Sequence, residues 1–299
     1  MDMTLFPGFE QGSAATDGDV RIAYVHGGSG PPLLLLHGHP QTSAIWHRVA
    51  PALARRFTLV AADLRGYGDS SKPRGAPDHA NYAKRTMARD MLVLMRSLGF
   101  DRFDVLAHDR GARVAHRLAA DHPEVVRRLV LLDIAPTLSM YEQTSEAFAR
   151  AYWHWFFLIQ PAPLPERLIE ADPAAYIRDM MGRRSAGLAS FDPRALAEYQ
   201  RCAALPGAAH GLCEDYRAAA SIDLAHERAD RDAGLQLPMP VLVLWGEEGV
   251  VHRCFRPLAE WRRMAPNLRG GPLPCGHSIA EEAPDRLLDE VFPFFSSGD

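Results

Sequence analysis

The 299-residue sequence lacks the features that mark several large classes of protein. No apolar run approaches the roughly 20 residues that a membrane-spanning helix needs. The formal net charge is −4 and no long basic run occurs, which argues against nucleic acid as a partner. The four cysteines form no CxxC pair, and the histidines show no HExxH or similar metal-ligand spacing. The first residues, MDMTLFPGFEQGS, contain no apolar segment typical of a secretory signal. We therefore expect a reduced, cytoplasmic protein without a metal ion.

Segments with strand and helix patterns alternate along most of the chain. Short apolar runs that end in glycine or aspartate predict buried strands, and the segments between them have the 3.6-residue apolar spacing of helices. This alternation predicts an α/β fold, with a mostly parallel sheet and helices on both faces. The expected strands lie in VRIAYVHGGSGPPLLLLHG, FTLVAADLRGYGDS, RFDVLAHD, VRRLVLLDIAP and MPVLVLWGEEG.

A long segment without a convincing strand interrupts the alternation. Residues 137–234 are rich in tryptophan, tyrosine, phenylalanine, arginine and alanine, and their prolines are spaced as helix starts. We expect this segment to form a helical cap, or lid, inserted after the strand that ends at Asp133. Residues 1–136 and 235–299 then form the core, so that the chain has one domain with a lid.

Three residues that can carry chemistry follow expected strands, in the order Asp109, Asp133 and His277. In an open α/β sheet, ligands bind beyond the carboxyl ends of the strands. The order nucleophile, acid, histidine is that of the α/β-hydrolase fold, where the nucleophile usually lies in G-x-S-x-G. Here the segment is A-H-D-R-G, with Asp109 in place of the serine.

The aspartate changes the chemistry that this order supports. A carboxylate is ionised near neutral pH and can displace a leaving group from saturated carbon without a base. His277 would then activate a water that hydrolyses the resulting ester, and Asp133 would orient the imidazole. The structural alternatives are a helix N-cap for Asp109, a strand-end turn residue for Asp133 and an ordinary loop histidine for His277.

An oxyanion hole needs two backbone N–H groups. We expect one from Arg110, the residue after the nucleophile, and the other from His39 in the segment HGHPQ. His37 in that segment is expected to shape the turn, and His108 to pack at the elbow.

Arg110 and Arg113 are three residues apart and share one face of the expected helix. An intrahelical ion pair between Asp109 and Arg113 is the simplest structural explanation. Two unpaired cations in a cavity would be costly, however, and a substrate carboxylate would satisfy them. They would also offset the repulsion between an anionic substrate and the nucleophile, about 4 kcal/mol at 4 Å and an effective dielectric constant near 20. We therefore expect a small anion with a leaving group next to its carboxylate.

The segments HDRGARVAHR, LLDIAPT, YWHWFF and GHSIAEEAPD resemble those of fluoroacetate dehalogenases, within the α/β-hydrolase superfamily. The resemblance covers nearly the whole chain and implies hydrolysis of haloacetates to glycolate and halide without a cofactor. It also implies a homodimer, a carboxylate clamp of Arg110 and Arg113, and a halide pocket. The halide-binding residues implied are His154, Trp155 and Tyr216. One departure is His39, where this family usually has an aromatic apolar residue.

Two other function classes remain open. Epoxide hydrolases share the aspartate, the histidine and the lid, and use lid tyrosines to protonate the epoxide oxygen. The lid offers such tyrosines, although the paired arginines and His154-Trp155 argue against this function. A non-catalytic protein that binds small anions is the second alternative, and the complete Asp-Asp-His set argues against it. The lid tyrosines are Tyr141, Tyr152, Tyr176, Tyr199 and Tyr216.

Overall fold

The computed structural model describes residues 1–183 and 187–296, and an eight-stranded sheet is its central element. The strand order is β1-β2-β4-β3-β5-β6-β7-β8. The pairings β1–β2 and β2–β4 are antiparallel, and the other five are parallel. The strands are β1 (Glu10–Asp17), β2 (Val20–Gly28), β3 (Pro32–Leu36), β4 (Thr58–Ala62), β5 (Phe103–His108), β6 (Val126–Leu132), β7 (Val241–Gly246) and β8 (Leu268–Leu273).

The two edge strands of this sheet were not foreseen from the sequence. Strand β1 has the sequence EQGSAATD and no buried residue, and β8 has the sequence LRGGPL, in which only Leu273 is buried. Neither segment has the apolar run by which the inner strands are recognised, because an edge strand has fewer neighbours to pack against.

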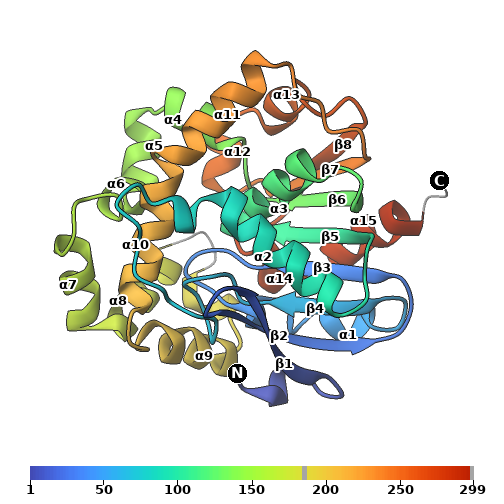
Figure 1. Cartoon of the computed structure of the whole chain (residues 1–299), viewed down its shortest axis with the longest axis horizontal. Helices are drawn as coiled ribbons and strands as arrows, with labels where there is room; N and C mark the ends of the chain where they lie inside the picture. Colours follow the sequence, from blue (N-terminus) through green and yellow to red (C-terminus); the bar gives the residue numbers. More distant parts are fainter. Residues whose placement is uncertain (184–186, 297–299) are drawn as a thin grey trace.

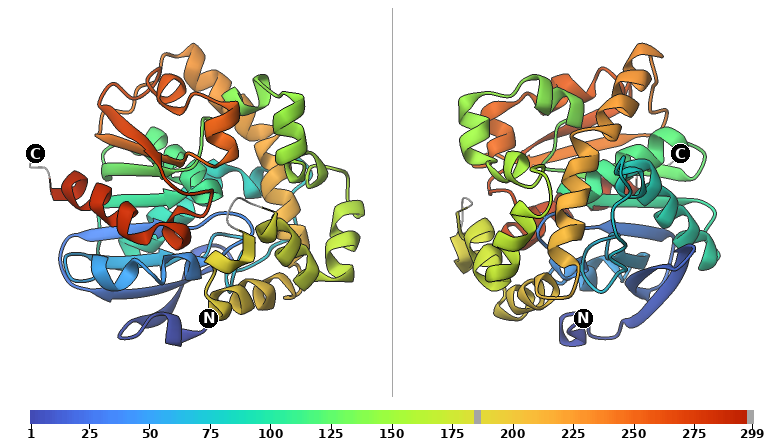
Figure 2. Two further views of the ribbon diagram at one scale, coloured as in Figure 1. Left: turned by 180° about the vertical axis from the view of Figure 1, so that it is seen from behind. Right: turned by 60° about the vertical axis from the view of Figure 1, so that its left-hand side comes forward.

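Helices cover both faces of the sheet, which confirms the predicted fold class. Alternate side chains of the inner strands point to opposite faces: Leu34 and Leu36 pack on one face, Leu33 and Leu35 on the other. Figure 1 shows α2 and α3 in front of the sheet, and the left view of Figure 2 shows α15 across the opposite face. The helices of the first face are α2 (Lys84–Ser97), α3 (Asp109–Asp121) and α13 (Pro257–Trp261), and those of the second are α1 (Ala50–Leu53), α14 (Ile279–Glu282) and α15 (Pro284–Ser296).

Eight α-helices of the described residues lie between β6 and β7 in the chain. They gather at one end of the sheet (Figure 1). The separation of this segment from the core, at residues 137 and 234, stays a prediction. Residues 184–186 and 297–299 of the predicted units lie outside the described residues. The eight helices are α4 (Thr137–Glu142), α5 (Glu146–Ala151), α6 (His154–Phe157), α7 (Leu164–Ala171), α8 (Pro173–Gly182), α9 (Pro193–Ala203), α10 (Ala208–Ala219) and α11 (Ile222–Asp232).

The parallel strands bring the predicted chemical residues to one edge of the sheet. Asp109 directly follows β5 and Asp133 directly follows β6, while His277 lies between β8 and α14. Because parallel strands end on the same side, these three loops meet there. Among residues 1–183 and 187–296, every helix is too short or too polar to cross a membrane.

Candidate active site

Asp109 lies in a sharp turn between β5 and α3. Its φ angle is 47°, a left-handed conformation that costs an L-residue about 1–3 kcal/mol. The turn lets α3 pass close to the end of β3. At this point the amide of Gly111 donates a hydrogen bond to the backbone oxygen of His37 at 2.8 Å. A Cβ atom at Gly111 would collide with that oxygen. The turn therefore holds the Asp109 carboxylate beyond the strand end, with only 4% of the residue exposed.

The loop after β3 brings the His39 amide to this carboxylate. The His39 N–H donates to Oδ1 of Asp109 at 2.9 Å. A Cβ atom at Gly38 would collide with the Asp109 side chain, so this close approach requires glycine. The structure thus brings together the predicted nucleophile and one of its two predicted oxyanion donors. The role of the Arg110 amide stays a prediction.

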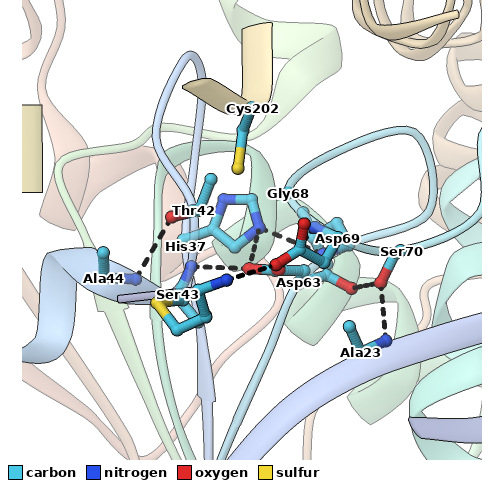
Figure 3. Close-up of polar contacts among 12 residues, drawn as sticks. Ala23, His37, Thr42, Ser43, Ala44, Asp63, Gly68, Asp69, Ser70 and Cys202 are labelled. Carbon is cyan, nitrogen blue, oxygen red and sulfur yellow. Dashed lines mark hydrogen bonds and ion pairs between the residues drawn. The ribbon is translucent and has the colours of Figure 1, made fainter. Parts of the chain in front are cut away.

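His37 and Asp63 support this loop from below. The Nε2 atom of His37 accepts a hydrogen bond from the Leu64 amide at 3.0 Å, so Nδ1 carries the proton and faces the Gly38 oxygen at 3.0 Å. Burial lowers the pKa of His37, which agrees with a neutral ring. Oδ1 of Asp63 accepts from the Ser43 amide at 2.8 Å, and Figure 3 shows His37 and Asp63 side by side beneath the loop. These contacts give His37 the turn-shaping position expected for it.

His277 and Asp133 form a close pair next to the nucleophile. Nδ1 of His277 lies 2.5 Å from Oδ2 of Asp133, and Oδ1 of Asp133 accepts from the Gly246 amide at 3.0 Å. The φ angle of Asp133 is 51°, so a second strained turn aims a carboxylate into the site. Tyr152 Oη also lies 3.3 Å from Nδ1. Because Nδ1 faces these groups, Nε2 is the nitrogen that points away from Asp133.

A cavity of about 260 Å³ reaches this histidine from the protein surface. Tyr152 and His277, which are both buried, are among the residues that line it, so the cavity has room for water beside the histidine. Its other lining residues are Ala151, Arg183, Glu248, Gly249, Val250 and Arg253.

His108, for which only packing was expected, joins the two loops. Its Nε2 atom donates to the backbone oxygen of His277 at 2.8 Å, and the two rings lie 4.6 Å apart. Burial, together with the nearby His277, lowers the pKa of His108 to about 3. His108 is therefore a neutral donor that ties the elbow to the histidine loop.

The expectation that both arginines are unpaired cations is wrong for Arg110. Arg110 is fully buried, and its Nε donates to Oδ2 of Asp215 at 2.8 Å. Its Nη2 donates to the backbone oxygen of Asp215 at 2.9 Å and to Oδ1 at 3.1 Å. Only Nη1 has no hydrogen-bond partner in the described part of the chain. A substrate carboxylate would therefore meet one nitrogen of Arg110, not its full fork.

Arg113 is held by uncharged groups. Its Nη1 donates to the Ala135 oxygen at 3.1 Å and to Thr137 Oγ1 at 2.9 Å, and its Nη2 faces the Met140 sulfur at 3.1 Å. Burial, reinforced by the charge of Arg110, lowers the pKa of Arg113. Its Nε has no hydrogen-bond partner among residues 1–183 and 187–296. The two arginines thus each retain one nitrogen that an anion can use.

Two of the three predicted halide residues lie directly against these arginines. The guanidinium of Arg110 lies 4.1 Å from the ring centre of Tyr216, and that of Arg113 lies 4.8 Å from the ring of Trp155. Tyr216 Oη and Trp155 Nε1 are buried and have no hydrogen-bond partner within the described ranges. The His154 ring stacks on the His39 ring, with centres 5.7 Å apart. The predicted clamp and the predicted halide pocket are therefore one cluster.

Sequence reasoning missed the partners of several of these side chains. Asp215 pairs with Arg110 and also accepts hydrogen bonds from Lys84 and Tyr67. Tyr176 Oη lies 3.0 Å from Nε2 of His39. The segment CEDYRAA contained one sequence signal for these partners. It places two acids directly before Tyr216, in a helix that is mostly buried. Charged residues at buried helical positions need partners. No group of three or more histidine, cysteine or acidic residues suited to a metal ion occurs in residues 1–183 and 187–296.

Comparison with known proteins adds independent evidence. The family model for the α/β hydrolase fold matches residues 31–284. The fluoroacetate dehalogenase of Burkholderia sp is 48% identical over 98% of this chain and 97% of its own length. The soluble epoxide hydrolase of Corynebacterium sp. (strain C12) is 35% identical over 92% of this chain and 94% of its own. The resemblance inferred from the motifs is therefore confirmed.

Solved structures agree with this result over nearly the whole chain. ALR0039 from Nostoc sp PCC 7120 is 52% identical, with a TM-score of 0.94 over 97% of this chain and 99% of that one. Cfl2 from Burkholderia cenocepacia is 33% identical, with a TM-score of 0.87 over 96% of each chain. The inserted helices are thus part of the shared architecture.

Proposed function

The chain belongs to the α/β-hydrolase family, and on this premise we propose that it hydrolyses haloacetates, fluoroacetate and chloroacetate among them, to glycolate and halide. The hydrogen bond from the His39 amide to Oδ1 of Asp109 carries the proposal. It fixes Oδ1 in a donor site, and we assign the attack to Oδ2. The identity with the fluoroacetate dehalogenase supports the choice of substrate.

In the first step, Oδ2 of Asp109 attacks the carbon that bears the halogen. The carbon–halogen bond breaks, halide leaves with its electron pair, and glycolate is held as an ester of Asp109. Fluoride is strongly hydrated, so its release requires close donors that replace water. Trp155 Nε1 and Tyr216 Oη are suited to this, because both are buried donors without a protein partner in the described chain.

In the second step, His277 accepts a proton from water, and the hydroxide attacks Cγ of Asp109. The negative charge then develops on Oδ1, which is the atom that the His39 amide already contacts. Asp133 stabilises the protonated ring through Nδ1. Collapse of the intermediate breaks the bond between Cγ and the ester oxygen, and the proton on His277 passes to glycolate.

Arg110 and Arg113 would bind the substrate carboxylate between them. Each offers one nitrogen without a protein partner in the described residues, Nη1 of Arg110 and Nε of Arg113. A carboxylate that bridges two arginines is fixed at both oxygens, so its α-carbon is directed at Asp109. We propose the segment 137–234 as the lid that closes this site, since Trp155 and Tyr216 belong to it.

Hydrolysis of epoxides is the second candidate function. The lone phenol of Tyr216 favours it, because an opening epoxide oxygen needs a proton donor and this hydroxyl is buried without a partner in the described ranges. The relationship to the soluble epoxide hydrolase of Corynebacterium supports it as well. The arginine pair favours an anionic substrate, which most epoxides are not.

The test is fluoride release from fluoroacetate, measured with a fluoride electrode. We expect release by the wild type and none by Asp109→Asn, which keeps the size of the side chain and removes the nucleophile. Parallel assays with chloroacetate and styrene oxide separate the two candidates. Turnover of styrene oxide alone would favour the second candidate and overturn the first.

A further inference from the structure

Asp215 is an acid beside the proposed site that has several charged and polar partners. It belongs to α10, is completely buried, and accepts hydrogen bonds from three side chains. Arg110 Nε and Tyr67 Oη donate to Oδ2 at 2.8 and 2.6 Å. Arg110 Nη2 and Lys84 Nζ donate to Oδ1. A carboxylate has about four acceptor positions, so those of Asp215 are filled.

These contacts fix the orientation of the Arg110 guanidinium. The edge that carries Nε and Nη2 faces Asp215, and the Asp215 backbone oxygen accepts from Nη2 as well. The Tyr216 ring covers one face of the group at 4.1 Å. With one edge and one face occupied, Nη1 is the nitrogen that remains for an anion.

Lys84 gives Asp215 a second positive neighbour. Lys84 begins α2, and its Nζ also lies 3.6 Å from Oδ2 of Asp223. Burial alone would raise the pKa of Asp215, but the charges of Arg110 and Lys84 hold it well below its usual range. Asp215 is thus a permanent anion that links core helices α2 and α3 to α10 of the proposed lid.

We propose that Asp215 is a positioning residue for the first chemical step: it holds Arg110 with Nη1 toward the substrate carboxylate and away from Asp109. This inference rests on the proposed function. Asp109 is the acid next to Arg110 in the chain, and without Asp215 it is the anion that Arg110 would pair with. Such a pair would occupy the nucleophilic carboxylate of Asp109. It would also move Arg110 away from the position in which it binds the substrate carboxylate. The second step would be spared, because it depends on His277, Asp133 and the His39 amide.

The test follows the two steps separately in Asp215→Asn, which keeps the side-chain shape and removes the charge. Enzyme in excess is mixed with chloroacetate, quenched at intervals, and the ester on Asp109 is followed by mass spectrometry. We expect ester formation to slow at least tenfold and ester hydrolysis to change less than twofold. The KM for chloroacetate should rise as well, because the clamp is disordered.

The double variant Asp215→Asn with Lys84→Met separates positioning from folding. Removal of Lys84 takes away the buried cation that the single variant leaves without Asp215, so the melting temperature should return toward that of the wild type. Ester formation should stay slow, because Arg110 still lacks Asp215 and can pair with Asp109 instead. If ester formation recovers together with the melting temperature, Asp215 is only structural and the proposal is wrong.

The same experiment distinguishes an error in the role of Asp215 from an error in the proposed function. If the wild type forms no ester on Asp109, the proposed mechanism is wrong and this inference is overturned with it. If the wild type forms the ester and Asp215→Asn forms it at the same rate, only the inference is overturned. Equal slowing of both steps in Asp215→Asn would indicate general damage and would also overturn it.

Discussion

The Nε2 atom of His108 donates a hydrogen bond to the backbone oxygen of His277 at 2.8 Å. The residue before the proposed nucleophile thereby holds the loop of the proposed base. The two residues are 169 positions apart in the chain, and this bond sets the position of His277 relative to Asp109. The contact lies on the histidine side of the site, so it should matter for ester hydrolysis more than for ester formation.

We predict that His108→Ala slows ester hydrolysis about tenfold or more, since a small misplacement of a catalytic group has effects of up to about 100-fold. Ester formation should change much less. Quenched single-turnover experiments with chloroacetate measure both steps. His116→Ala is the matched control, because His116 is also buried but lies in α3 and packs on Trp261. If both variants behave alike, the bond to His277 has no specific role.

The buried carboxyl group of Glu281 should make the stability of the folded protein depend on pH. It is completely buried beside Tyr199 Oη, which donates to it at 2.9 Å, and burial raises its pKa from 4.5 to about 8. Between these values the folded protein keeps a proton that the unfolded chain has lost, so stability falls as pH rises, and the fall ends above about pH 8. One pKa unit corresponds to about 1.4 kcal/mol.

The variant Glu281→Gln should remove this dependence, because glutamine does not titrate. Relative to the wild type, it should be more stable at pH 9 than at pH 5.5, by at least ~1 kcal/mol. Urea unfolding at several pH values measures the difference. Parallel stability curves for the two proteins would show that Glu281 does not titrate in this range.

The backbone amide and the side chain of His39 should contribute differently to turnover. Its amide contacts Asp109, whereas its ring contacts Tyr176 and His154. His39→Phe keeps the amide and an aromatic ring, and a lost ring contact is worth about 0.5–1.5 kcal/mol, so fluoroacetate turnover should fall by no more than about tenfold. The ratio of chloroacetate to fluoroacetate turnover should shift.

Gly38→Ala is the counterpart of this variant. Its Cβ would collide with Asp109 and displace the amide, and loss of one oxyanion donor typically costs about 100- to 1,000-fold. Steady-state kinetics compare the two variants. If turnover falls more in His39→Phe than in Gly38→Ala, the imidazole ring of His39 matters more than its amide, and the prediction is wrong.

Removal of the Arg113 side chain should weaken substrate binding. A hydrogen bond to a charged group contributes about 1.5–3 kcal/mol, so Arg113→Ala should lower kcat/KM for chloroacetate about 10- to 150-fold. Arg127→Ala is the control, since Arg127 pairs with Asp104 at the start of β5, away from the proposed site. Wild-type kinetics in Arg113→Ala would refute the clamp.

The sequence predicts the centre of this fold better than its edges. The inner strands β3 to β7 are apolar because both faces of the sheet are covered, and each was found from that pattern alone. Strands β1 and β8 carry polar and small residues and were missed. Their pairing depends on neighbours that are distant in the chain.

The same limit applies to the candidate site. Asp109, Asp133 and His277 follow recognisable strands, and their order alone predicts that they meet. Asp215 lies 105 positions from Arg110, and no local pattern announces their ion pair. A close look at the buried charges beside Tyr216 would have suggested a cationic partner, but not which one.

The covalent ester of Asp109 is the central claim, and a single turnover in ¹⁸O-labelled water tests it most directly. Enzyme in excess over chloroacetate is allowed one turnover, and the peptide that contains Asp109 and the released glycolate are weighed by mass spectrometry. The account predicts that ¹⁸O enters the Asp109 carboxylate, because water attacks Cγ and glycolate leaves with an original oxygen of Asp109. Label in glycolate, with none in Asp109, would show direct attack of water on the substrate and contradict the account.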